Sequence, residues 1–357
     1  MGTKVRSVIQ TLMLLVVATA CGSSPTAVVT PSSSPGPAAI LDDHFGFLAG
    51  NVVRRESDLQ PVFELAIPNN SGGVVSPDGR RLAYEEGNEL RVIDIAPGTR
   101  PRTLLTTTSK ESGIHVAWSS DSTGIVVGVV GPWASAVDAP PGYTEIRVVD
   151  VAGGQPRAVV RIANANVDPL TWDRQAHVIT AYQQSSSGVV SYYVVDEGGS
   201  LKRSNAGPFY TVAASQDGRQ VLGQGDPNSV VRVWPFNSYE RGVELRSAAP
   251  EEHIAMVAWR PGTAEVGVLF HGDRLELWDA SGARRTIALP PAPTTSDRYA
   301  MLAFRVDGKA AVITRQSGVE GSTDVYGVAV DLTTGRSVVI PMVNDVPMPG
   351  TSVRIGP

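Results

Sequence analysis

The sequence predicts an all-β chain, and three observations support this: its composition, the period-2 alternation of its apolar residues, and the recurrence of one short turn. Val, Thr, Gly and Pro are plentiful, and no long stretch places apolar residues at helical spacing, which favours strands. Apolar residues make up 42% of the chain and charged residues 18%, which is typical of a packed domain rather than a disordered chain. The recurring turn is clearest at residues 76–79, Ser-Pro-Asp-Gly.

A repeated unit of four short strands accounts for most of the chain. Successive copies of the residue before the turn lie about 42 to 54 residues apart, at Val75, Trp118, Trp172, Ala214, Trp259 and Phe304. After each turn come two short apolar strands and then, past a further turn that contains Gly in most units, a last short strand. Alternating strands with turn chemistry at both ends predict antiparallel sheet in every unit.

These units predict a β-propeller, because one four-stranded sheet cannot bury both faces while radially stacked sheets cover each other. Six units occupy residues 68–341, and two incomplete pieces remain. Residues 44–67 resemble the last three strands of a blade, and residues 350–356 resemble a first strand. We therefore predict seven blades, closed by pairing of the N- and C-terminal strands, with six or eight blades as alternatives.

The units resemble the WD-repeat-like propeller repeats of TolB-type proteins. "VSPDGRRLAY" at residues 75–84 fits the W/F-S-P-D-G-x-x-[IL]-[AV] pattern best, and residues 213–223 and 303–313 are weaker copies. The unit at Trp172 lacks the glycine and the unit at Trp259 has Pro-Gly in place of Asp-Gly, so period and strand pattern alone predict those two blades. The resemblance implies a fold and no particular activity.

Residues 1–20 are predicted to be a lipoprotein signal peptide. Lys4 and Arg6 precede an apolar run over residues 8–20, which is too short to span a bilayer comfortably. Ala-Thr-Ala-Cys at residues 18–21 resembles a bacterial lipobox, although Ala18 stands where Leu is more usual. The alternative is an ordinary signal peptide in which the cysteine is incidental.

Cys21 is predicted to carry the lipid, because its thiol is the nucleophile that accepts a diacylglyceryl group and it is the chain's only cysteine. Residues 21–40 are rich in Ser, Pro, Thr and Gly and are predicted to be a flexible tether. Residues 41–357 form the predicted propeller domain. We therefore expect a membrane-bound bacterial lipoprotein whose propeller faces the periplasm or the cell exterior.

Composition and motifs favour a binding module over an enzyme. The net charge of −5 argues against a nucleic-acid partner. Neither G-x-S-x-G nor H-E-x-x-H occurs, and the five histidines lack ligand spacing, so no catalytic, cofactor-binding or metal-binding residue is predicted. We expect a monomer that binds a protein, a peptide or a cell-envelope component. The alternative is a lactonase-like propeller hydrolase with a metal in its central channel, whose ligands would come from different blades.

The candidate recognition loop is the long irregular segment over residues 128–145. It holds Trp133, Asp138 and Tyr143 among Pro and Gly, and loops of this kind often carry binding residues on a rigid scaffold. The alternative is a surface insertion packed on itself. The aspartates of the recurring turns and the aromatics before them are predicted to be structural, as turn caps and inter-blade packing.

Overall fold

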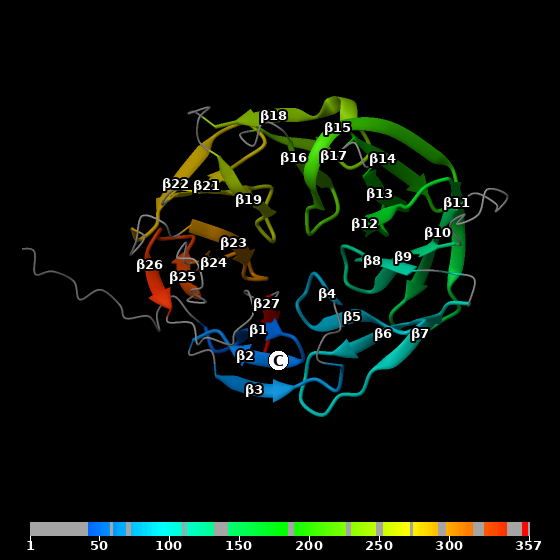
Figure 1. The fold of residues 1–357 in the computed structure, drawn as a ribbon, viewed down its shortest axis with the longest axis horizontal. Helices are drawn as coiled ribbons and strands as arrows, with labels where there is room; N and C mark the ends of the chain where they lie inside the picture. Colours follow the sequence, from blue (N-terminus) through cyan, green and yellow to red (C-terminus); the bar gives the residue numbers. More distant parts are fainter. Residues whose placement is uncertain are drawn as a thin grey trace, which may run out of the picture. The chain divides into compact units, whose positions relative to one another are not determined.

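The computed structural model describes residues 42–57, 60–68, 73–108, 111, 113–131, 142–184, 189–225, 230–247, 253–271, 274–291, 298–316, 325–340 and 352–355. In this part of the chain the fold is all-β, with one short 3-10 helix, η2 (Tyr239–Arg241). Seven antiparallel blades form a β-propeller, as the sequence predicts (Figure 1). None of the helices in these residues has the length and apolar character to cross a bilayer.

Blades 1 to 4 are each described from the innermost to the outermost strand. Blade 1 contains β27 (Ser352–Arg354), β1 (Phe45–Ala49), β2 (Val52–Arg55) and β3 (Pro61–Glu64). Blade 2 contains β4 (Gly73–Val75), β5 (Arg81–Glu86), β6 (Glu89–Asp94) and β7 (Arg102–Thr106). Blade 3 contains β8 (Gly113–Trp118), β9 (Gly124–Val130), β10 (Tyr143–Asp150) and β11 (Arg157–Ala163). Blade 4 contains β12 (Asp168–Asp173), β13 (Val178–Gln184), β14 (Val189–Asp196) and the first part of β15 (Leu201–Ala214).

Blades 5 to 7 complete the ring. Blade 5 contains the second part of β15, then β16 (Gln220–Gly225), β17 (Val230–Pro235) and β18 (Val243–Arg246). Blade 6 contains β19 (Ile254–Trp259), β20 (Val266–Phe270), β21 (Arg274–Trp278) and β22 (Arg284–Ala288). Blade 7 contains β23 (Arg298–Phe304), β24 (Ala310–Gln316), β25 (Val325–Asp331) and β26 (Ser337–Ile340). Because β15 runs on from the outer strand of blade 4 to the inner strand of blade 5, those two blades share one continuous sheet.

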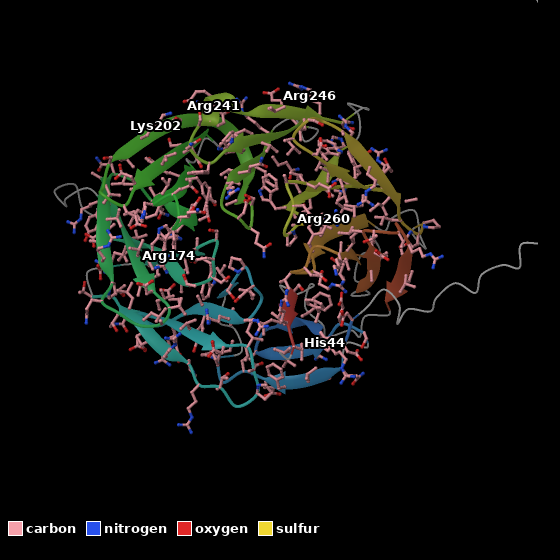
Figure 2. All side chains as sticks on the ribbon, turned by 180° about the vertical axis from the view of Figure 1, so that it is seen from behind. His44, Arg174, Lys202, Arg241, Arg246 and Arg260 are labelled. Atoms are coloured by element: carbon pink, nitrogen blue, oxygen red, sulfur yellow. The ribbon has the colours of Figure 1, made fainter. Side chains whose placement is uncertain are left out.

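The core lies between neighbouring blades. One cluster joins Ala83 and Leu90 of blade 2 to Trp118 and Ile125 of blade 3, and equivalent clusters lie between other neighbouring blades. The outermost strands are mostly exposed, as in β18, where only Leu245 is buried. Lys202, Arg241 and Arg246 accordingly lie at the rim of the disc (Figure 2). Each blade therefore gains its burial from its neighbours, which is the physical basis of the repeat.

The recurring turn is a structural cap. In blade 2, Ser76 Oγ donates a hydrogen bond to Asp78 Oδ1 at 2.5 Å, and the same oxygen accepts the backbone N–H of Arg80 at 3.1 Å. Gly79 has φ +73°, a conformation that glycine adopts without a Cβ clash. Blade 5 repeats the arrangement with Ser215 and Asp217. The carboxylates are occupied by the turn, in agreement with the structural role predicted for them.

The ring closes through β27, as the sequence predicts. Strand β27 pairs antiparallel with β1, with Phe45 opposite Arg354 and Phe47 opposite Ser352. Val353, in the middle of β27, has no exposed surface and belongs to the apolar cluster between blades 1 and 2. This three-residue strand supplies the whole inner edge of blade 1, so the N- and C-terminal parts of the domain depend on each other.

A buried ionic contact joins blade 7 to blade 1. Glu56 follows β2 and is only 1% exposed, and its Oε2 accepts a hydrogen bond from Arg305 Nη1 at 3.3 Å. Arg305 also donates to Asp307 at 2.8 Å and lies 4.7 Å from the centre of the Phe45 ring. Burial raises the pKa of Glu56 to about 7, although Arg305 opposes the shift. The Glu56 carboxyl group, at the contact between blades 7 and 1, therefore gains or loses its proton near neutral pH.

Candidate functional site

The central channel of the propeller contains a cavity of about 360 Å³. Innermost strands from all seven blades contribute to its wall, which places it on the axis of the ring. Its wall is largely apolar and includes the side chains of Val74, Val116, Leu170, Phe304 and Val306. A concave, mostly apolar chamber of this size is typical of a small-molecule site.

Two tryptophans of the chamber wall also bond one blade to the preceding blade. The indole N–H of Trp118 donates to the carbonyl oxygen of Val74 at 2.8 Å, and that of Trp259 donates to Ala213 at 3.0 Å. Both side chains are largely buried. This confirms the inter-blade role predicted for the recurring aromatics, and it also places two fluorescent groups at the wall of the chamber.

One side chain crosses the channel at the end that carries the recurring turns. Gln216, from the turn of blade 5, donates from Nε2 to the carbonyl oxygen of Pro77 in blade 2. Its Oε1 accepts the backbone N–H of Gly262 in blade 6 at 2.8 Å. Because blades 2 and 5 are not neighbours in the ring, this bond spans the channel at that end.

The opposite end of the channel carries a polar cluster, which we call the channel mouth: Glu85, His115, Asn166 and Asp168. His115 Nδ1 lies 2.6 Å from Asp168 Oδ1, and Nε2 lies 3.0 Å from Asn166 Oδ1. The side chains of His115 and Asp168 are each 34% exposed, so solvent reaches them. Glu85, His115 and Asp168 line a cavity of about 260 Å³.

The mouth and the chamber are parts of one channel. The 260 Å³ cavity shares Val74, Val116 and Pro169 with the chamber. His115 and Asp168 lie near the starts of β8 and β12, and inner strands run from this end towards the turns. A ligand that enters here meets charged groups first and apolar walls beyond them.

Three titratable groups at or beside the channel mouth, His115, Glu85 and Tyr182, have raised pKa values. The hydrogen bond to Asp168 raises the pKa of His115, and Asn166 adds to this because the imidazolium donates from both ring nitrogens. Burial raises the pKa of the Glu85 carboxyl, and burial together with Asp168 raises the pKa of the Tyr182 hydroxyl. With His115 protonated, the mouth holds two carboxylates and one cation, so its net charge is negative.

The structure leaves the predicted recognition loop largely outside the described residues. Trp133 and Asp138 lie within residues 132–141, which are not described. Tyr143 is the first residue of β10, is partly buried, and has the Arg161 guanidinium 4.1 Å from the centre of its ring. Cys21 also lies outside the described residues. The recognition loop and the lipidation site therefore stay predictions.

No linear signal in the sequence pointed to the channel mouth. Glu85, His115 and Asp168 belong to three different blades, and the histidines show no regular spacing along the chain. Only the ring geometry brings the three side chains to one cavity. Among the described residues, no group of three or more His, Cys, Asp or Glu side chains is arranged to hold a metal ion.

The described part of the chain is a seven-bladed β-propeller with an apolar channel and a polar mouth. No protein-family model matches the sequence, and no curated protein matches it significantly. It is similar in structure to a functionally unknown protein from Desulfotomaculum acetoxidans, with a TM-score of 0.54 and 10% identity over 88% of this chain and 100% of that one.

Two further solved structures share the fold. AztD from Citrobacter koseri has a TM-score of 0.52 and 15% identity, covering 86% of this chain and 83% of its own. The dihydro-heme d1 dehydrogenase NirN, solved in complex with DHE, has a TM-score of 0.50 and 14% identity, covering 88% and 76%. At these identities the likeness is one of fold, and a fold that hosts a dehydrogenase and a protein of unknown function assigns no activity.

Proposed function

We propose that this chain is a lipid-anchored, extracytoplasmic β-propeller that binds a small ligand in its central channel. The observation that carries the proposal is the continuity of an apolar chamber of about 360 Å³ with a polar mouth built by Glu85, His115 and Asp168. A few convergent polar groups at the edge of an apolar cavity are typical of a binding site. The predicted signal peptide, the predicted lipidation of Cys21 and the predicted tether of residues 21–40 support the extracytoplasmic location.

The chemistry of the mouth favours an apolar ligand that carries an amine. Glu85 and Asp168 give the mouth two carboxylates, whereas His115 gives it one cation at most. An ammonium group placed between these carboxylates would gain charge-assisted hydrogen bonds. The hydrocarbon body of the same ligand would then lie against Val74, Val116 and Leu170 in the chamber.

Tryptophan fluorescence tests this proposal directly, because Trp118 and Trp259 lie at the chamber wall. Cyclohexylamine, cyclohexanol and cyclohexanecarboxylate share one apolar body and differ in charge. We expect the amine to bind most tightly and the carboxylate most weakly.

Glu85→Gln should weaken amine binding about tenfold, equivalent to about 1.4 kcal/mol, by removing one charge from the mouth. Binding should also weaken as the pH falls, because the hydrogen bond to Asp168 raises the pKa of His115 and its protonation adds a positive charge to the mouth.

Glu86→Gln is the matched control, since Glu86 neighbours Glu85 on β5 but pairs with Arg91 at 2.8 Å. This variant should bind the amine as the wild type does. Equal affinity for all three compounds, or equal effects of the two substitutions, would contradict the proposed site.

Membrane anchoring is tested separately with Cys21→Ser, which removes the only thiol of the chain. We expect the wild type to incorporate an alkyne-labelled fatty acid and to fractionate with membranes. The variant should lose the label completely, since it has no thiol to accept a lipid. A Cys21→Ser chain that still incorporates the label would contradict lipidation at this residue.

A further inference from the structure

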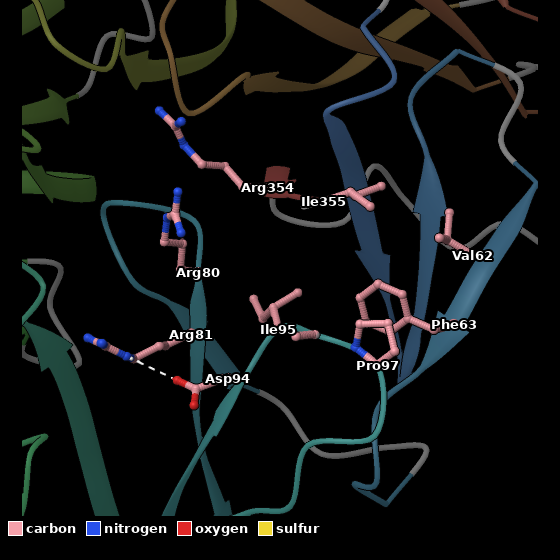
Figure 3. Close-up of a pocket in the computed structure, with 10 residues that line it drawn as sticks. Val62, Phe63, Arg80, Arg81, Asp94, Ile95, Pro97, Arg354 and Ile355 are labelled. Atoms are coloured by element: carbon pink, nitrogen blue, oxygen red, sulfur yellow. Dashed lines mark hydrogen bonds and ion pairs between the residues drawn. The ribbon is translucent and has the colours of Figure 1, made fainter. Parts of the chain in front are cut away.

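A second cavity lies away from the channel, between blades 1 and 2. Its volume is about 540 Å³, and it opens on the side of the ring that carries the recurring turns. Blade 2 contributes the end of its turn and the end of β6, and blade 1 contributes β3 and the end of β27. Figure 3 shows its two unlike sides, with guanidinium groups on one and hydrocarbon side chains on the other. We call it the arginine pocket.

Three arginines make the polar side of the arginine pocket: Arg80, Arg81 and Arg354. The backbone N–H of Arg354 donates to the carbonyl oxygen of Gly79 at 3.0 Å, which holds β27 against the turn that carries Arg80. Arg81 is neutralised, because its Nε lies 3.1 Å from Asp94 Oδ1.

Arg80 and Arg354 have no acidic partner within ion-pair distance among the residues that the structure describes. With three arginines and one aspartate, the pocket has a formal charge of 3 − 1 = +2. The whole chain, by contrast, has a net charge of −5. A local excess of positive charge on an acidic protein selects an anionic partner.

The other side of the pocket is apolar and partly open. It is formed by Val62, Phe63, Ile95, Pro97 and Ile355. Val62 is 37% exposed, so a hydrophobic surface remains accessible beside the guanidinium groups. A matching ligand therefore carries both an anion and an apolar group.

We propose that the arginine pocket binds the carboxyl-terminal segment of a partner protein whose last side chains are apolar. The terminal carboxylate of such a segment faces the guanidinium side, and its last apolar side chains face the hydrocarbon side. Guanidinium groups bind carboxylates with charge-assisted, often bidentate hydrogen bonds. The carboxylate pairs with Arg80 and Arg354, and the last apolar side chains of the segment pack against Ile95 and Phe63. This site is separate from the channel and serves a different class of ligand.

Fluorescence polarisation with two labelled peptides tests this inference on the full-length chain in detergent. Both peptides end in the same aliphatic residue, one with a free carboxyl terminus and one with an amidated terminus. We expect the free form to bind at least about tenfold more tightly, because amidation removes the anion. Arg80→Glu should weaken binding of the free form by a similar factor.

Arg219→Glu is the matched control. Arg219 occupies the position of Arg80 in the turn of blade 5, where its backbone N–H donates to Asp217 Oδ1 at 3.0 Å, and it does not line the pocket. This variant and Glu85→Gln should bind the free peptide as the wild type does. Equal binding of the two peptides, no binding of either, or equal effects of Arg80→Glu and Arg219→Glu would overturn the inference. Phosphatidylglycerol vesicles that displace the labelled peptide from Arg80→Glu as strongly as from the wild type would also overturn the inference.

Discussion

Val353→Asp is expected to lower the free energy of unfolding by about 3 to 5 kcal/mol. Val353 has no exposed surface and packs in the cluster between blades 1 and 2. An aspartate there would place a charge in an apolar environment without a partner. Its strand, β27, is only three residues long and supplies the whole inner edge of blade 1, so the substitution also weakens the closure of the ring.

Urea unfolding followed by tryptophan fluorescence measures this loss. Val339→Asp provides the control, because Val339 lies in β26 of blade 7 and is 52% exposed. The control should stay within about 0.5 kcal/mol of the wild type, as is usual for surface substitutions. If both variants lost the same free energy, or if Val353→Asp lost none, closure by β27 would not be a main source of stability.

Glu56→Gln is expected to remove a pH dependence of stability between about pH 4.5 and pH 7. Burial raises the pKa of Glu56 from 4.5 to about 7 in the folded protein. The folded state therefore binds more protons than the unfolded state in this window. The stability due to this group is fully present below pH 4.5 and is lost as the pH rises through 7. At about 1.4 kcal/mol per pKa unit, the loss is about 3 kcal/mol.

The measurement is the free energy of unfolding at several pH values for the wild type and the variant. Glutamine is neutral at every pH and keeps an oxygen for the Arg305 guanidinium, so Glu56→Gln should be nearly flat in this window and more stable than the wild type at pH 8. Glu265→Gln is the control, because Glu265 also pairs with an arginine, Arg260, but its side chain is 29% exposed. A wild type that becomes more stable from pH 5 to pH 8, with Glu56→Gln less stable at pH 8, would show that the charged pair with Arg305 dominates.

Most of the fold was predictable because it rests on local chemistry that repeats. The Ser-x-Asp-Gly turn contains its own hydrogen bonds, as Ser76 and Asp78 show, and it predicts a hairpin wherever it occurs. The two incomplete segments at the ends were enough to predict the closure that β27 and β1 form. The continuous strand β15 was not predictable in the same way, since Asn205, Gly207 and Pro208 favour a loop over an extended crossing.

The two candidate sites were beyond the reach of sequence patterns. His115 and Asp168 are separated by a whole blade in the sequence, and Arg80 and Arg354 by almost the whole propeller. The members of each pair line one cavity because neighbouring blades pack side by side in the ring. Spacing along one strand carries no information about such contacts.

The sequence alone determines the blade, because period, turn chemistry and alternation act within about 45 residues. It also predicts the closure of the ring and the lipidation of Cys21 that would attach the chain to a membrane. Only the tertiary structure decides which polar groups share a cavity. The channel mouth, the arginine pocket and the Glu56–Arg305 contact each combine residues from different blades. The physical reason is that closing the ring sets these distances, while each repeat by itself specifies only its own sheet.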